Sequence, residues 1–152
     1  MRQWRFQMAS AAALLWAAGV ALAQDALPPP EQPLPAARQS GAVVYVTGGV
    51  AEGEFAAFEA ARMDYPLSIE LIQANPEGRD QFTAGAEVSV RNAAGIEVLQ
   101  ATADGPYMLV QLPPGRYTVH ATLNGRAAPS RSVTVEDEGS GRAVLRFPAG
   151  TD

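Results

Sequence analysis

Few residues in this 152-residue chain could carry out chemistry. His120 is the only histidine and there is no cysteine, so neither a zinc site of the two-histidine, one-glutamate type nor a thiolate site can be assembled. No G-x-S-x-G elbow is present, and no serine adjoins a signal that would make His120 its general base. His120 alternates with apolar residues, which places it on the polar side of a predicted strand. We therefore expect a protein that is not an enzyme, with no catalytic, cofactor-binding or metal-binding residues.

Two other segments have compositions that could bind an ion. Glu136–Glu138 is the densest acidic cluster, but it lacks the alternating spacing of a calcium loop, so we interpret it as a solvated hairpin loop, with a weak cation site as the alternative. Gly48 and Gly49 precede a predicted helix, where backbone N–H groups could hold an anion, yet no lysine follows. We interpret these glycines as positions that need backbone freedom.

The aromatic residues offer little support for a carbohydrate platform. Both tryptophans, Trp4 and Trp16, fall within the first 23 residues. Three tyrosines are expected in core or half-buried strand positions: Tyr45, Tyr107 and Tyr117. Tyr65, beside a proline, is the one whose place the pattern does not assign.

The elements that position these residues begin with a strand–helix–strand lead over residues 41–72. The run 42–47 is β-branched and apolar on both faces, which predicts a strand that is covered on both sides. Apolar residues at three-residue steps predict a helix over about 52–63, and alternation from Leu67 to Leu71 predicts a second strand. The helix could form a crossover between the two strands or lie across one sheet face.

From residue 84 to residue 148 the pattern changes to short strands separated by turns. The segment 107–112 is apolar on both faces and predicts a central strand. Asn124-Gly125 is the strongest short hairpin signal. Turn signals recur about every ten residues, which is typical of an antiparallel sandwich. The expected fold is therefore mainly β, one antiparallel sandwich preceded by the lead, in a single domain over residues 41–152.

Part of this region resembles a known family. Its most specific piece is Leu112-Pro113-Pro114-Gly115-Arg116-Tyr117-Thr118-Val119, preceded by Gly85, Val88, Val90, Asp104-Gly105, Tyr107 and Leu109 and followed by Asn124-Gly125. With these residues the chain resembles the carboxypeptidase regulatory-like domain, a transthyretin-like (prealbumin-like) β-sandwich. The ordered region is also similar to uncharacterised exported proteobacterial proteins. The resemblance implies a sandwich fold in a mostly non-catalytic family, and it carries no functional residues over to this chain.

The N-terminus predicts export. Two arginines precede a short, alanine-rich apolar run that ends in Ala21-Leu22-Ala23, so residues 1–23 are expected to be a signal peptide cleaved between Ala23 and Gln24. An uncleaved membrane anchor is the alternative. Residues 24–40 are rich in proline and predict an extended linker, with a proline-rich recognition ligand as the alternative. The protein is expected in the periplasm or outside the cell, without stable membrane insertion after cleavage.

The charge limits the classes of partner. Without residues 1–23 the chain keeps nine of its eleven basic side chains and all sixteen acidic ones, for a net charge of −7. Nucleic acid is therefore an improbable partner, because phosphate binding needs clustered positive charge. We predict a non-catalytic exported module that binds an unknown envelope protein or serves as a structural accessory. The alternative is a protein that binds a small ligand, a glycan or a peptide.

Overall fold

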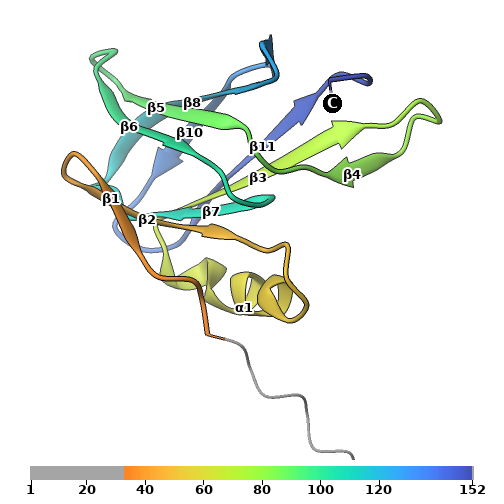
Figure 1. Ribbon diagram of the computed structural model, residues 1–152. Helices are drawn as coiled ribbons and strands as arrows, with labels where there is room; N and C mark the ends of the chain where they lie inside the picture. Colours follow the sequence, from red (N-terminus) through yellow and green to blue (C-terminus); the bar gives the residue numbers. More distant parts are fainter. Residues whose placement is uncertain (1–32, 152) are drawn as a thin grey trace, which may run out of the picture.

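The computed structural model describes residues 33–151 and has three layers (Figure 1). Two β-sheets face each other as a sandwich, and a single short helix covers the outer face of one of them. This confirms the predicted fold class, mainly β with antiparallel-rich sheets and a helix after the first strands. The predicted signal peptide, its cleavage site at Ala23 and Gln24, and the first part of the linker lie outside the described residues.

The first sheet has the strand order β1-β2-β7-β3-β11, and β4 also pairs with β3. Its strands are β1 (Arg38–Ser40), β2 (Val43–Gly48), β3 (Leu67–Ala74), β4 (Asp80–Phe82), β7 (Tyr107–Val110) and β11 (Gly141–Phe147). The second sheet has the order β10-β8-β5-β6, with β9 paired to β8. Its strands are β5 (Glu87–Asn92), β6 (Glu97–Thr102), β8 (Gly115–Leu123), β9 (Arg126–Ala127) and β10 (Arg131–Val135).

Between the sheets lies one large core, built from the alternating apolar residues that the sequence singled out. Leu67, Ile69 and Leu71 of β3 are fully buried, and so are Val88 and Val90 of β5. The inward residues of β8 and β11 complete it: Tyr117, Val119, Ala121, Leu123, Ala143, Leu145 and Phe147. The alternation in each strand thus predicted correctly which side faces inward.

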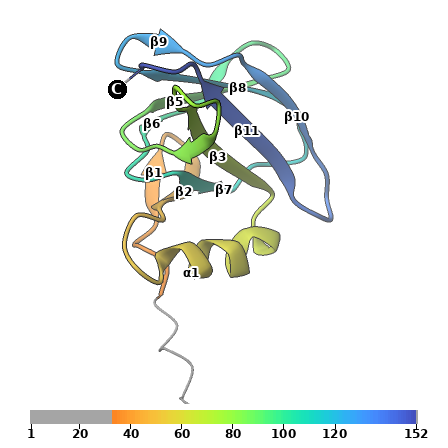
Figure 2. The ribbon, with the colours of Figure 1, turned by 90° about the vertical axis from the view of Figure 1, so that its right-hand side faces the viewer.

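The strand–helix–strand lead is part of the sandwich. Both β2 and β3 pair antiparallel with β7, so they run parallel to each other in one sheet, and the chain between them forms a crossover. Figure 2 shows the helix of this crossover lying across the outer face of that sheet. The helix therefore forms the crossover between the two strands and also lies across one sheet face, the two possibilities that the sequence left open. Residues 84–148 alone would supply only β7 and β11 to the first sheet, and β3 lies between those two strands.

The helix is shorter than predicted. Helix α1 spans Glu54–Ala61 and is followed by a 3₁₀ turn, η1 (Arg62–Asp64), instead of one helix over 52–63. The residue at the N-cap, Gly53, has a left-handed backbone conformation with φ of 87°, and this excludes Glu52 from the helix.

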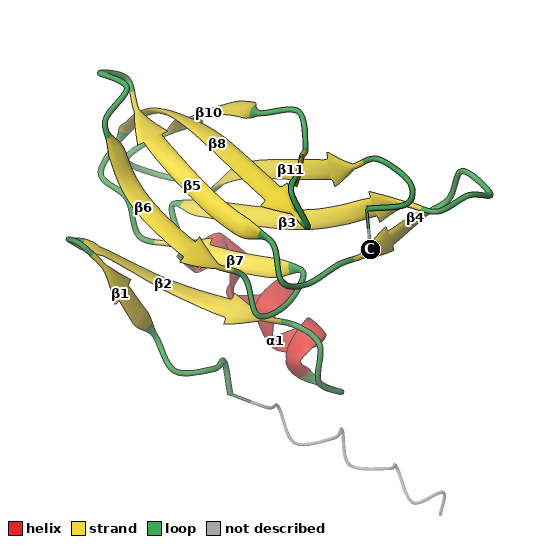
Figure 3. Ribbon diagram, turned by 45° about the horizontal axis from the view of Figure 1, so that its top comes forward, coloured by secondary structure: helices red, strands yellow, loops and turns green. Residues whose placement is uncertain are grey.

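Three features were not predicted. The end of the predicted linker forms β1, which pairs with β2 (Figure 3). Residues 80–82, which lie between the lead and the predicted sandwich strands and had no predicted element, form β4 on the edge of β3. The last strand, β11, pairs with β3 in parallel, an exception to the antiparallel pattern.

Side chains join the two sheets along both open sides of the sandwich. On one side the Ser40 hydroxyl of β1 donates to the Gln100 carbonyl of β6 (3.1 Å) and accepts from the Gln100 N–H (3.3 Å). On the other side Arg131 Nε of β10 donates to the Val144 carbonyl of β11 (3.1 Å). These contacts satisfy backbone groups on edge strands, which would otherwise be free to pair with another chain.

The two turns that flank β8 have the expected geometry. Asn124 and Gly125 both have positive φ, 49° and 80°, as a two-residue hairpin turn requires. Before β8, the hydroxyl of Tyr117 donates to the Pro113 carbonyl (2.7 Å) and fixes the proline turn against the core. Burial raises the pKa of Tyr117 above its usual value.

We predict that Gly105→Ala destabilises the protein by about 3 kcal/mol, because a β-carbon on Gly105 would lie 2.2 Å from the Gly48 carbonyl oxygen of β2. Gly78→Ala is the matched control. Gly78 has open space around it, so only its left-handed φ opposes the change, at a cost of about 1 kcal/mol. Urea denaturation measures both free energies of unfolding. Equal losses in the two variants would show that β2 does not limit the space at Gly105.

Candidate functional site

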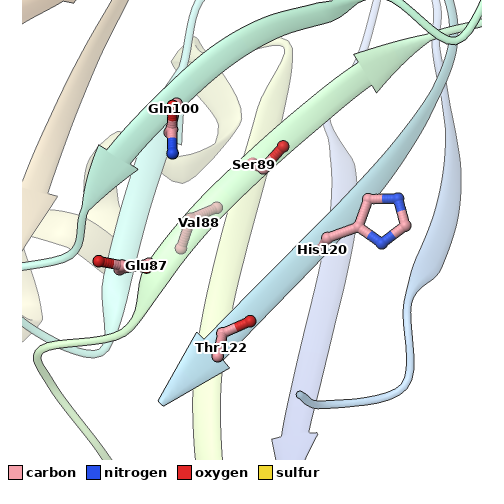
Figure 4. A pocket seen from close by; sticks show the side chains of 6 residues that line it. All are labelled: Glu87, Val88, Ser89, Gln100, His120 and Thr122. Atoms are coloured by element: carbon pink, nitrogen blue, oxygen red, sulfur yellow. The ribbon is translucent and has the colours of Figure 1, made fainter. Parts of the chain in front are cut away.

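The single histidine lies beside a shallow polar depression on the outer face of the second sheet (Figure 4). In the register of β5 and β8, Ser89 faces His120, and Glu87 faces Thr122. Gln100 of β6 completes the row opposite Ser89. His120 is exposed on this polar face, as its alternation predicted.

This depression does not arrange a serine for nucleophilic chemistry. The Ser89 hydroxyl donates to the Glu97 carboxylate (2.7 Å), so its proton is directed away from the histidine. Figure 4 shows the imidazole of His120 extending to the side of β8 that is away from Glu87. A serine nucleophile needs its base within hydrogen-bond reach and a third group that orients the base. The depression therefore offers polar groups for a weak contact and no catalytic relay.

The two glycines before α1 do not form an open anion site. One carboxylate oxygen of Glu54 accepts the N–H of Gly49 (2.9 Å) and, less closely, that of Ala51 (3.3 Å). The backbone N–H groups that a phosphate would use thus already have an anionic acceptor from the same chain. Gly49 also has φ of 97°, and a β-carbon there would lie 2.6 Å from the Tyr107 ring. These observations favour the interpretation that backbone freedom and close packing explain both glycines.

The acidic cluster lies in the connection between β10 and β11, where Glu136, Asp137 and Glu138 are exposed. Over residues 33–151, no three histidine, aspartate or glutamate side chains lie close enough together to hold a metal ion. The loop fits a solvated turn.

A different surface brings three aromatic rings together, two of them exposed. We call it the aromatic surface and define it as Phe55 of α1, Phe82 of β4 and Tyr107 of β7. The ring centroids are 6.1 Å apart for Phe55 and Phe82, 5.7 Å for Phe55 and Tyr107, and 5.5 Å for Phe82 and Tyr107. Tyr107 is buried beneath the other two, whereas Phe55 and Phe82 are 47% and 50% exposed.

The topology of the first sheet explains why these rings meet. β7 and β4 both pair with β3 on the side away from β11, β7 with residues 67–70 and β4 with residues 72–74. Between them, the Leu71 N–H donates to the Pro106 carbonyl (2.8 Å) and its carbonyl accepts the Thr83 N–H (3.2 Å). Tyr107 and Phe82 therefore follow each other along one side of β3. The first turn of α1 then places Phe55 against both rings.

Tyr107 links this surface to a second, smaller core between α1 and the sheet. Its ring stacks on Phe58 at 5.8 Å with an interplanar angle of 22°, and both residues pack with Val46 and Leu109. Burial, with a smaller contribution from the Glu70 and Glu59 carboxylates, raises the pKa of Tyr107 to about 12. The tyrosine is thus a neutral, fixed support for the two exposed rings.

Charged side chains surround the aromatic surface. Arg142 pairs with Glu70, and the pKa of Arg142 is raised by this hydrogen-bonded carboxylate. Arg146 of β11 pairs with Asp80 of β4 (2.6 Å). On the helix side the acids outnumber the bases, with Glu52, Glu54 and Glu59 against Arg62.

Sequence reasoning missed this surface. The three-residue spacing placed Phe55 and Phe58 on one core-facing stripe, but only Phe58 is buried. Phe82 fell between the lead and the sandwich strands, where no element was predicted, and a lone phenylalanine between polar residues was the available signal. Tyr65, which the pattern could not assign, is half-buried and packs against the smaller core.

We predict that between pH 10 and pH 12 the free energy of unfolding falls less in Tyr107→Phe than in the unchanged protein. The folded chain holds the Tyr107 pKa at about 12, against an ordinary value of 10.0. Deprotonation therefore favours the unfolded chain, so stability that is fully present below pH 10 is lost as the pH rises towards 12. Urea midpoints measured across this range in both proteins test the effect. Identical pH profiles would contradict it.

The described residues thus offer two candidate binding surfaces, the polar depression and the aromatic surface.

In the part of the chain that the structure describes, no helix has the length and apolar character needed to cross a membrane. No protein-family model matches the chain, and no curated protein matches it either.

Proposed function

We propose that this protein is a non-catalytic, exported binding module that docks on another protein of the cell envelope through the aromatic surface. The proposal extends to the periplasm or the exterior as its location, and to kinship with carboxypeptidase regulatory-like sandwiches. The predicted signal peptide and the proline-and-glycine turn before Tyr117 support these two parts.

The exposure of Phe55 and Phe82 is the observation that carries the proposal. Each ring leaves about half of its surface in water, although both rings contact the buried Tyr107 and each other. Interface residues with the largest binding energies are commonly aromatic side chains on a fixed base, surrounded by polar groups. The aromatic surface has this arrangement, with ion pairs on its sheet side and acidic residues on its helix side.

The surrounding charge selects the chemistry of the partner. The ion pairs on the sheet side neutralise each other. On the helix side Arg62 pairs with Glu59 (3.8 Å), so Glu52 and Glu54 leave that side acidic. We propose that the partner presents a peptide segment in which apolar side chains are flanked by lysine or arginine. Such charges increase the rate of association and select the partner, while the rings supply most of the affinity.

The small-ligand alternative would use the polar depression of Glu87, Ser89, Gln100, His120 and Thr122. Ligand sites that bind tightly are concave and mostly apolar, with a few convergent polar groups. This depression is shallow, and His120 extends away from Glu87 (Figure 4). The aromatic surface is therefore the better supported binding site.

We predict that a photo-reactive phenylalanine analogue at position 82 crosslinks to an envelope partner in living cells, whereas the same analogue at position 96 does not. Ile96 is the control because it is 61% exposed and lies in the turn between β5 and β6 of the other sheet. The partner identified in this way is then purified, and its affinity for the protein is measured by calorimetry.

In that assay we expect Phe55→Ala with Phe82→Ala to weaken binding at least about tenfold, because two aromatic contacts are truncated. Ile96→Ala should leave the affinity unchanged. Since both rings are half exposed, the double variant should keep a cooperative thermal transition close to that of the unchanged protein. Full affinity in the double variant would refute docking through the aromatic surface.

A further inference from the structure

The edge strand β4 leaves one side of its backbone unpaired beside the aromatic surface. Among the described strands, β4 pairs with β3 alone. The Thr83 N–H donates to the Leu71 carbonyl (3.2 Å), so Thr83 directs its backbone groups towards β3. Because the direction of these groups alternates along an antiparallel strand, Gln81 also faces β3. The N–H and C=O groups of Asp80 and Phe82 therefore point away from it.

The first sheet has a step at this place. β2 runs beside β7 as far as Gly48, which is opposite Tyr107, and the chain then leaves the sheet towards α1. β4 continues the line of β7 along β3, beyond the end of β2 (Figure 3). All three residues of β4 are exposed. In the described part of the chain, no strand thus occupies the place beside β4 that β2 would reach if it continued.

The residues around this step indicate which segment fits it. Asp80 and Phe82 lie on the same face of the sheet, because side chains two residues apart in a strand share a face. This face also carries Phe55, whose ring lies 6.1 Å from that of Phe82. An added strand would place every second side chain there, where apolar groups would contact both rings. Glu52 and Glu54 favour lysine or arginine at the ends of that strand.

A second copy of this chain suits the step less well. The chain has a formal net charge of −5, so two copies repel each other. β4 has only three residues and offers the free backbone groups of two, and edges this short limit pairing between copies. A suitable occupant therefore adds contacts with the rings and brings positive charge.

We propose that the partner segment binds as an added antiparallel β-strand along the free side of β4, with alternate apolar side chains against the aromatic surface and basic residues at its ends. This inference rests on the proposed function, because it gives the way in which the partner occupies the same surface. Hydrogen bonds with the backbone of Asp80 and Phe82 fix the register of the segment, and the rings select its side chains. The antiparallel direction follows from the greater stability of antiparallel pairing per residue.

Backbone methylation of a peptide probe tests the added strand. The probe is a short synthetic peptide in which valine and serine alternate, with lysines at both ends. Valines that face the rings lie opposite Asp80 and Phe82, so the valine N–H groups point towards β4 and the serine N–H groups point away. We expect N-methylation of the valines to weaken binding at least about tenfold, and N-methylation of the serines to change the affinity less than about twofold. Titration of the isotope-labelled protein by NMR measures both affinities and follows the Phe82 amide.

Four results would overturn the inference: no binding of the unmodified peptide, equal affinities of the two methylated peptides, a larger loss for the serine set, or binding that survives Phe55→Ala with Phe82→Ala. The crosslinking and affinity tests with an external partner are separate. A crosslinked partner that needs both rings, found together with any of these results, would retain docking through the aromatic surface and exclude strand addition. Conversely, a probe that binds as expected without any crosslinked partner would refute the proposed function and leave the strand site standing.

Discussion

β7 lies between β2 and β3, and each of its two faces supplies a different core. Met108 and Val110 face the second sheet and enter the core of the sandwich, while Tyr107 and Leu109 face α1 and form the smaller core with Phe58 and Val46. The strand has only four residues, so neither core can shift along it without disturbing the other. The position of α1 and the stacking of the two sheets are therefore coupled through one short, fully buried strand.

β7 also restricts the backbone conformation of the segments that lie next to it. Gly105, just before β7, passes so close to the Gly48 carbonyl that a β-carbon has no room. Gly49 then turns away from β2 with φ of 97°, which leads the chain to α1. Glu54 accepts the N–H groups that this turn would leave unpaired, and thereby fixes the start of the helix. Gly105, Gly49 and Glu54 thus together limit where Phe55 lies.

The local sequence pattern predicted which side of each long strand faces the core and which strand is central. Alternation identified the inward residues of β3, β5, β8 and β11, and the two-sided apolar run 107–112 identified the central strand. The parallel pairing of β11 with β3 could not be found in this way, because β11 has the same alternation whichever strand it joins. Strands as short as β1 and β4 carry almost no periodic signal, so they were missed as well. The start of α1 was predicted wrongly because it depends on the backbone conformation of Gly53, which spacing does not show.

The candidate site was harder to predict than the fold for a related reason. A residue type such as histidine indicates possible chemistry from the sequence alone. Alternation along the strand then placed His120 correctly on a polar face. Phenylalanine implies burial instead, so a stripe that includes Phe55 and Phe58 predicts core for both. Phe55 is nevertheless half exposed, because the sheet beneath its side of the helix is filled by Tyr107, whose ring already occupies the space against Phe58. The aromatic surface thus arises because α1 and β7 supply more aromatic rings than the smaller core can enclose. Phe82 from β4 adds a further ring beside them.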